Sequence, residues 1–216
     1  METLFDGLLF DLDGTLWDSV DAVCTSWNRT LAELAPEFAG RITRPGMEAC
    51  MGMLTPDILR RMLPELEEVR LPALLDRVLQ AENDYVARHG GVLYPDVPET
   101  LAVLAARYPL FIVSNCQDGY IEAFFQAHGL GGYFTDYEDP GRTGKPKADN
   151  IRLVMARRGL RHPLYIGDTQ GDLDAASGAG IPFLHAAYGF GQVPSGVPAV
   201  RSFGAIPAAV EALSPP

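Results

Sequence analysis

Leu8-Leu9-Phe10-Asp11-Leu12-Asp13-Gly14-Thr15-Leu16 is the stretch that decides the fold, because a short apolar run ends in it at two carboxylates spaced two residues apart. Side chains alternate between the faces of a strand, so Asp11 and Asp13 are expected to point the same way and to act on one ligand. Such a pair suits a divalent cation with oxygen ligands, or a nucleophile beside a proton donor. The Gly14-Thr15 step adds a tight turn, free backbone N–H groups and a hydroxyl, which suit an anion.

Two other interpretations of this stretch are a simple strand-ending turn and a calcium-binding loop. Asp-x-Asp-Gly can end a strand simply because its residues favour turns, and this interpretation stays open at this point. An EF-hand loop also opens with Asp-x-Asp, but it needs Gly at its sixth position and Glu at its twelfth. Counted from Asp11, these positions hold Leu16 and Ala22, which excludes a calcium loop.

The composition is that of a globular protein with an acidic surface. The chain has 216 residues, of which 47% are hydrophobic and 21% charged, enough for one large domain or for a core that carries a smaller inserted one. A formal charge of −11 argues against nucleic acid or an anionic membrane as partner, because phosphate binding relies on clustered Lys and Arg. Positive charge for an anionic ligand would have to be supplied locally.

Cysteine usage and the apolar runs indicate the cellular setting. Cys24, Cys50 and Cys116 are an odd number without Cys-x-x-Cys spacing, so we expect reduced cysteines and neither a disulfide framework nor a zinc site. No apolar stretch reaches the roughly 18 residues that span a bilayer, and residues 1–6 lack the basic region of a signal peptide. We expect a cytoplasmic protein.

The order of apolar runs predicts an α/β fold with a doubly wound parallel sheet and an inserted α-helical cap. Runs at residues 8–10, 110–113, 164–166 and 182–187 predict buried strands, and amphipathic stretches at 148–158 and 172–179 predict crossover helices. The gap between the first two strands is longer than one crossover needs, and its patterns are helical. We therefore expect an α/β core over residues 1–16 and 89–216, and a helical cap over residues 17–88.

Polar residues follow the first three predicted strands. Because ligands bind outside the carboxyl ends of the strands in open α/β sheets, these residues are expected to meet at one edge. Each group alone has an ordinary explanation as a turn, a helix cap or a solvated charge. Their joint occurrence favours a site, whose candidate residues are Asp11, Asp13, Ser114, Asn115, Asp168 and Asp172, with Lys145 and Lys147 just before a helix.

The motifs resemble those of the haloacid dehalogenase (HAD) superfamily over nearly the whole chain. The similarity is carried by four ordered segments, which are Phe10-Asp11-Leu12-Asp13-Gly14-Thr15-Leu16, Val113-Ser114-Asn115, Lys145-Pro146 and Gly167-Asp168-Thr169-Gln170-Gly171-Asp172. The helical insertion is similar to the cap of the phosphoglycolate phosphatase-like branch. The resemblance implies a Rossmann-like core and a hydrolase that acts on a small phosphorylated substrate.

The resemblance also implies a role for each matching position. Asp11 would be the nucleophile and Asp13 the general acid and base. The cofactor would be Mg²⁺, bound by the Asp11 side chain, the Asp13 backbone carbonyl and Asp168, with Asp172 as a ligand or as support. The phosphoryl group would be held by the remaining polar residues, which are Thr15, Ser114, Asn115 and Lys145, with Lys147 as the alternative lysine.

Three functions remain open on these grounds. The first is a Mg²⁺-dependent phosphatase that forms an aspartyl phosphate on Asp11, because dehalogenases of this superfamily generally lack an acid at the position of Asp13. The second is a phosphoryl transfer like that of β-phosphoglucomutase, which shares the core motifs. The third is a non-catalytic binding module that retains a metal site. The substrate and the oligomeric state are not predicted.

Within the predicted cap, a few residues could contact the substrate. They are Val20, Trp27 and residues 46–49, for which helix packing is the alternative. Arg44 could recognise a second anionic group or could simply lie at the surface.

Overall fold

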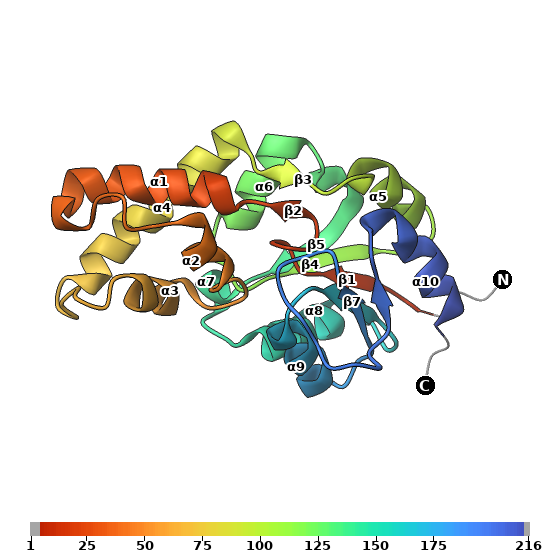
Figure 1. Cartoon of the computed structure of the whole chain (residues 1–216). Coiled ribbons are helices and arrows are strands. Elements are labelled where there is room, and N and C mark those ends of the chain that lie inside the picture. Colours follow the sequence, from red (N-terminus) through yellow and green to blue (C-terminus); the bar gives the residue numbers. More distant parts are fainter. Residues whose placement is uncertain (1–4, 214–216) are drawn as a thin grey trace.

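The computed structural model describes residues 5–213, and at its centre is a six-stranded parallel sheet of order β5-β4-β1-β6-β7-β8 (Figure 1). β1 (Leu8–Phe10) lies between β4 (Leu110–Val113) and β6 (Leu164–Gly167), and pairs with both. β7 (Phe183–Ala186) pairs with β6, which confirms the fourth predicted strand. Residues 1–4, used in the signal-peptide and domain predictions, and residues 214–216 lie outside the described range.

The sequence pattern does not predict the two strands at the edges of the sheet. β5 (Phe134–Glu138) pairs with β4 along only one side, and most of its residues are partly exposed, so its sequence Phe-Thr-Asp-Tyr-Glu lacks an apolar run. β8 (Ala199–Val200) has two residues and follows a stretch of turns and irregular structure at residues 187–198. A strand paired on one side need not bury both of its faces, so its hydrophobic signal is weaker.

Helices cover both faces of the sheet, as in a doubly wound fold (Figure 1). Alternate residues of β1 show this division, because Leu8 and Phe10 belong to one hydrophobic cluster and Leu9 belongs to the other. The first cluster includes residues of α5 (Val97–Ala105), α6 (Tyr120–His128) and α10 (Ile206–Ala212), with the 3₁₀ turns η2 (Gly131–Tyr133) and η3 (Phe203–Ala205) alongside. The second cluster includes residues of α8 (Lys147–Arg158) and α9 (Gln170–Ala179), and the short α7 (Pro140–Thr143) precedes α8.

Four of the five α-helices between β1 and β4 form a group at one end of the molecule, on the left in Figure 1. They have a hydrophobic cluster of their own, centred on residues such as Trp27, Leu59 and Val78. A two-stranded antiparallel ribbon of β2 (Trp17–Asp18) and β3 (Val92–Leu93) lies where the chain enters and leaves this group. The inserted helices are α1 (Val20–Leu34), α2 (Arg44–Glu48), α3 (Thr55–Met62) and α4 (Leu71–His89), with the 3₁₀ turn η1 (Pro36–Phe38) between α1 and α2.

Two further features of the described residues bear on the sequence expectations. Cys24, Cys50 and Cys116 are free and buried. Within residues 5–213, no helix combines the length and the apolarity needed to cross a bilayer.

Candidate active site

The predicted site residues gather at the carboxyl ends of the central strands. Asp11 directly follows β1, Ser114 directly follows β4, and Asp168 directly follows β6. All three side chains are buried. The parallel pairing of β1 with β4 and β6 brings these strand ends together at one edge of the sheet.

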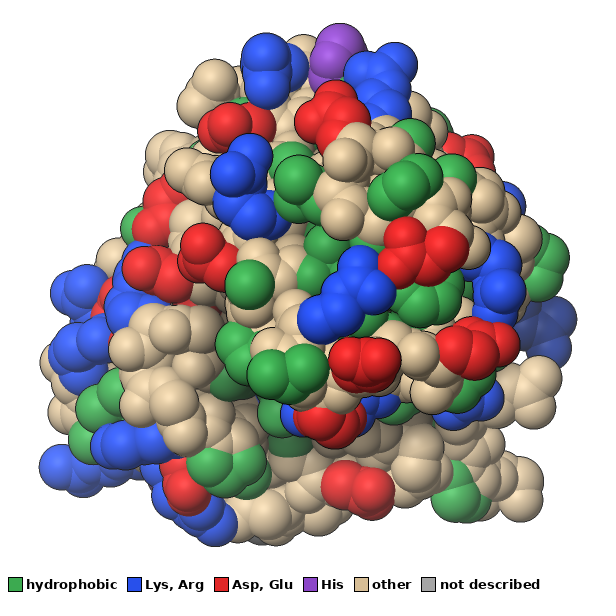
Figure 2. All heavy atoms as spheres, turned by 90° about the vertical axis from the view of Figure 1, so that its left-hand side faces the viewer, with side chains coloured by type: hydrophobic (Ala, Val, Ile, Leu, Met, Phe, Trp, Pro, Cys, Tyr) green, Lys and Arg blue, Asp and Glu red, His purple; other side chains and the backbone are tan. Residues whose placement is uncertain are grey.

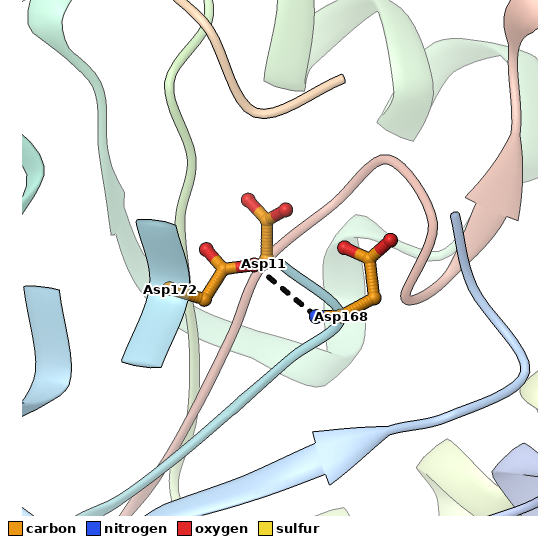
Figure 3. Close-up of side chains that lie close together, drawn as sticks. All are labelled: Asp11, Asp168 and Asp172. Carbon is orange, nitrogen blue, oxygen red and sulfur yellow. Dashed lines mark hydrogen bonds between the residues drawn. The ribbon is translucent and has the colours of Figure 1, made fainter. Parts of the chain in front are cut away.

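Three carboxylates form the centre of the site. One oxygen each from Asp11, Asp168 and Asp172 lies within 4.8 Å of the others (Figure 3). Asp11 follows β1, Asp168 follows β6, and Asp172 lies in α9. Burial and the nearby Asp172 carboxylate raise the pKa of Asp11 to about 6, and burial with the two neighbouring carboxylates raises that of Asp168 to about 8. Three acids so close together repel one another when ionised, so the cluster favours a bound positive charge.

Asp168 supplies the observation that tests whether a divalent cation fits. Its Oδ2 accepts the backbone N–H of Phe190 at 2.7 Å, whereas its buried Oδ1 has no hydrogen-bond partner among residues 5–213. A buried carboxylate oxygen without a donor is costly unless an ion or another donor satisfies it. Carboxylate oxygens are the ligands that hard divalent cations such as Mg²⁺ prefer. The donor set therefore fits such a cation.

Asp172 is held in place by groups on both of its oxygens. Its Oδ2 accepts the backbone N–H groups of Asp168 and Thr169 at 3.1 and 2.9 Å, and together with Thr169 it forms a capping box at the start of α9. Its Oδ1 accepts from Lys147 Nζ at 2.6 Å. Asp172 thus orients the lysine and anchors the helix.

The structure places Lys147, rather than the predicted Lys145, beside the carboxylate cluster. Lys147 Nζ is buried and lies 2.9 Å from Asp11 Oδ1. Lys145 is exposed, because it lies in the loop before Pro146, while α8 begins at Lys147 and packs against the sheet. Burial alone lowers the pKa of Lys147, but the carboxylates of Asp11 and Asp172 raise it well above its usual value, so the amine stays charged.

Asp13 lies apart from the three-carboxylate cluster and faces a cavity. Its Oδ1 accepts from the Ser19 hydroxyl and, at 3.1 Å, from the Tyr120 hydroxyl. Burial raises the pKa of Asp13, against the opposing effect of these two hydrogen bonds. A carboxyl in this setting holds a proton more readily than one in water, which suits a proton donor. Neither Ser19 nor Tyr120 is predicted from the sequence.

The Gly14-Thr15 turn differs in part from its prediction. Gly14 has a φ of 78°, which favours glycine, and a Cβ there would collide with the Asp168 carboxylate. The backbone N–H groups of Gly14 and Thr15 donate to the carbonyls of Trp17 and Leu12 at 2.9 and 3.2 Å, so the expectation of free N–H groups is wrong. The Thr15 hydroxyl is buried and has no partner within the described part of the chain.

A small cavity lies between the sheet edge and the inserted helices. Its volume is about 50 Å³, and the core residues that line it include Asp11, Asp13 and Ser114. Asn115 also lines it, and its Nδ2 donates to the Gly52 carbonyl at 2.9 Å, which links the core to the segment between α2 and α3. The inserted segment contributes several side chains, among them Trp27, Met47, Thr55 and Glu82.

Glu82 is a site residue that sequence reasoning missed. It is 5% exposed on α4, and its Oε2 accepts from Trp27 Nε1 at 2.5 Å. Burial raises the pKa of Glu82 to about 7. A signal does exist in the sequence, because Glu82 continues the buried stripe of Leu74, Val78 and Val86 at helical spacing.

Comparisons with known proteins agree with this geometry. Residues 8–186 match the family model of the haloacid dehalogenase-like hydrolases. The chain belongs to this family. The phosphoglycolate phosphatase of Shigella boydii serotype 4 is 31% identical over 209 residues, which cover 85% of this chain and 82% of the relative. The phosphoglycolate phosphatase of Escherichia coli strain K12 is 29% identical over 209 residues, with 85% and 82% covered.

Solved structures share the haloacid dehalogenase-like fold. A predicted phosphoglycolate phosphatase from Haemophilus somnus 129pt has a TM-score of 0.81 and 23% identity, with 96% of this chain and 99% of that chain covered. CbbY from Rhodobacter sphaeroides, in complex with phosphate, has a TM-score of 0.76 and 18% identity, with 96% and 99% covered. These findings confirm the predicted superfamily and the predicted fold class.

Proposed function

We propose that this protein is a Mg²⁺-dependent phosphatase that hydrolyses a small phosphorylated metabolite through an aspartyl phosphate on Asp11. The family match and the phosphoglycolate phosphatases among its relatives support a phosphatase enzyme. The observation that carries the proposal is the placement of Asp11, which shares the carboxylate cluster, contacts Lys147 and lines the cavity that Asp13 also lines. The proposed nucleophile and the proposed proton donor thus line one cavity, and the ammonium group of Lys147 contacts the nucleophile from outside this lining.

The metal would be held by the carboxylates of Asp11 and Asp168 and by the backbone carbonyl of Asp13. We propose that Asp172 supports the site rather than binding directly, because both of its oxygens already accept hydrogen bonds from the protein. When bound, the cation would offset the negative charge of the phosphoryl group and of Asp11.

The reaction needs this positive charge, because a carboxylate must approach a phosphate dianion. The ammonium group of Lys147 already contacts the Asp11 carboxylate and reduces its repulsion of the phosphate. A carboxylate oxygen of Asp11 would attack phosphorus while the bond from phosphorus to the alcohol oxygen breaks. Asp13 would give its proton to that leaving oxygen, which is otherwise a poor leaving group.

The second half of the reaction reverses the role of Asp13. Once the alcohol has left, the Asp13 carboxylate would take a proton from water, and that water would attack phosphorus to release inorganic phosphate and restore Asp11. We assign Thr15, Ser114 and Lys147 to the phosphoryl group. We also propose that residues 17–88 act as a cap that keeps bulk water from the site. The cytoplasmic location stays a prediction.

A screen of phosphorylated metabolites tests the proposal. We expect Mg²⁺-dependent release of inorganic phosphate by the unmodified protein, and loss of that activity to background in the Asp11→Asn variant, because the amide is not a nucleophile. Asp76→Asn makes the same chemical change at an exposed position of α4 and should retain full activity. Circular dichroism checks that each variant is folded.

Two results would contradict the proposal. Full turnover by a folded Asp11→Asn variant would remove Asp11 as the nucleophile. Conversion of a sugar phosphate to its isomer without release of phosphate would instead support the mutase alternative.

A further inference from the structure

The cavity beside Asp13 has an unusual charge pattern for a site that takes an anionic ester. Its charged lining residues are all acids, namely Asp11, Asp13 and Glu82. Within the described residues, no Lys, Arg or His side chain lines it. Lys147 contacts Asp11 and Asp172 at the phosphoryl end and is not part of this lining. The space for the alcohol part of a substrate therefore lacks a cation.

Four arginines of the inserted segment form ion pairs outside the cavity. Arg44, which the sequence offered as a receptor for a second anionic group, instead contacts the carboxylates of Asp18, Asp21 and Glu48. Figure 2 shows that basic and acidic side chains are interspersed over the end of the molecule that carries the inserted helices. Exposed pairs of this segment include Arg41 with Glu65, Arg60 with Glu68 and Arg70 with Glu37.

Glu82 is fixed in the wall of the cavity from two helices. Trp27 on α1 donates to its Oε2, and α4 places its backbone, so the carboxyl cannot move to solvent without breaking a buried hydrogen bond. An ionised carboxylate offers about four acceptor positions, so it can still accept from a hydroxyl or an ammonium group. Asp13, the proposed proton donor to the leaving oxygen, lines the same cavity.

We infer that this site takes phosphate monoesters of small alcohols that carry no second negative charge, and that Glu82 selects them by accepting a hydrogen bond from the alcohol part. The inference rests on the proposed function and adds the substrate class to it. At a pH above about 7, the pKa to which burial raises Glu82, a carboxylate or a second phosphate in this cavity would face the ionised Glu82 side chain in a space of about 50 Å³ with little water to screen the repulsion. A hydroxyl or ammonium group would instead find an acceptor there. Phosphoglycolate, which appears in the name of the relatives, carries a carboxylate and therefore belongs to the esters that this site would disfavour.

Three esters of similar size test this inference through their kcat/KM values at pH 8, where Glu82, with its pKa of about 7, is mostly ionised. They are sn-glycerol 3-phosphate with neutral hydroxyls, O-phosphoethanolamine with an ammonium group, and 2-phosphoglycolate with a carboxylate. We expect the better of the first two to exceed 2-phosphoglycolate by roughly tenfold or more, because like charges at contact distance repel strongly in a partly buried site. The comparison of the first two shows which donor Glu82 prefers.

The Glu82→Gln variant then tests the residue itself. Its amide keeps an oxygen for Trp27 and removes the charge, so the preference against 2-phosphoglycolate should shrink by about tenfold. Asp84→Asn removes a carboxylate from an exposed position of the same helix and should leave the ratio unchanged. Because both substrates are measured on one sample, the ratio does not depend on the folded fraction.

The possible outcomes separate this inference from the proposed function. A native preference for 2-phosphoglycolate, or an equal ratio in Glu82→Gln, would overturn the inference while phosphatase activity stands. If the three esters are not hydrolysed, matched neutral and anionic esters that the metabolite screen does detect replace them, and a preference for the anionic member overturns it. Absence of Mg²⁺-dependent hydrolysis across the whole screen would refute the proposed function itself.

Discussion

At the scale of single residues, the proposed chemistry depends on how the Asp11 carboxylate is held. Lys147 donates to Asp11 and to Asp172, which in turn accepts from the backbone at the start of α9. The amine therefore has a fixed position and cannot drift into solvent as a loop lysine would. Fixed charges in a buried site cost no reorganisation during the reaction, which is the main reason that they assist catalysis.

The two neighbouring lysines provide a matched test of this arrangement. We expect Lys147→Ala to lower kcat by about 10²–10³-fold, the usual cost of losing one electrostatic contact to the reacting group. Lys145→Ala should change kcat less than twofold, because its side chain is exposed in the loop before α8. Steady-state assays with a substrate from the metabolite screen check both values. Equal activity of the two variants would show that Lys147 does not stabilise the transferring group.

These lysines also show the limit of sequence reasoning about the site. The strand ends predict Asp11, Ser114 and Asp168 correctly as neighbours, because parallel pairing forces them together. The choice between Lys145 and Lys147 depends on the residue at which α8 begins, and helix boundaries are weakly encoded. Tyr120 lies 107 positions from Asp13 and meets it only through tertiary packing.

At the scale of elements, the hydrogen bond between Trp27 and Glu82 joins α1 to α4 inside the cavity wall. The helical pattern expected in the inserted segment is found in α1 and α4, because both helices bury an apolar stripe at helical spacing. The edge strands β5 and β8 are not predicted, because partial exposure and short length leave them without an apolar run. A helix or strand can thus be predicted from the sequence when its buried residues recur with the period of that element.

The link between α1 and α4 predicts a pH-dependent stability. Burial raises the pKa of Glu82 from 4.5 to about 7, so the native state keeps a proton that the unfolded state has lost between these values. Native stability should therefore fall as pH rises through this window. The glutamine of the Glu82→Gln variant does not ionise. We therefore expect the free energy of unfolding of this variant to exceed that of the unmodified protein by on the order of 1–3 kcal/mol at pH 8, and to equal it near pH 4.

Urea unfolding at both pH values measures this difference. Asp84→Asn serves as the control, because its exposed carboxylate should shift stability by less than about 0.5 kcal/mol at either pH. A gain for Glu82→Gln that is the same at pH 4 and pH 8 would mean that ionisation of Glu82 is not its cause.

At the scale of the whole molecule, the carboxylate cluster joins two distant parts of the chain, residue 11 and residues 168–172. Asp11 follows β1, Asp168 follows β6, and Asp172 belongs to α9. A ligand that neutralises their repulsion binds the native state alone, since the unfolded chain does not hold these groups together, and it should raise the melting temperature. We expect millimolar Mg²⁺ at pH 8 to raise Tm by several degrees, and EDTA to reverse the effect.

Asp168→Asn should abolish this response, because it removes the carboxylate whose buried Oδ1 has no partner among the described residues. Asp174→Asn alters an exposed position of the same helix region and should keep the response. Scanning calorimetry with and without the cation measures both variants. A Tm shift that persists in Asp168→Asn would place the cation elsewhere.

The ribbon of β2 and β3 has a consequence for how such proteins diversify. Asp18 and Val92 are paired neighbours, so the two ends of the inserted helical group lie side by side. Everything between them can therefore be exchanged for a segment of another length or shape without altering the register of any strand in the six-stranded sheet. The residues that carry out hydrolysis and the residues that select the substrate can then change independently. A chimaera that carries the inserted segment of another family member at this junction should show the substrate preference of that member.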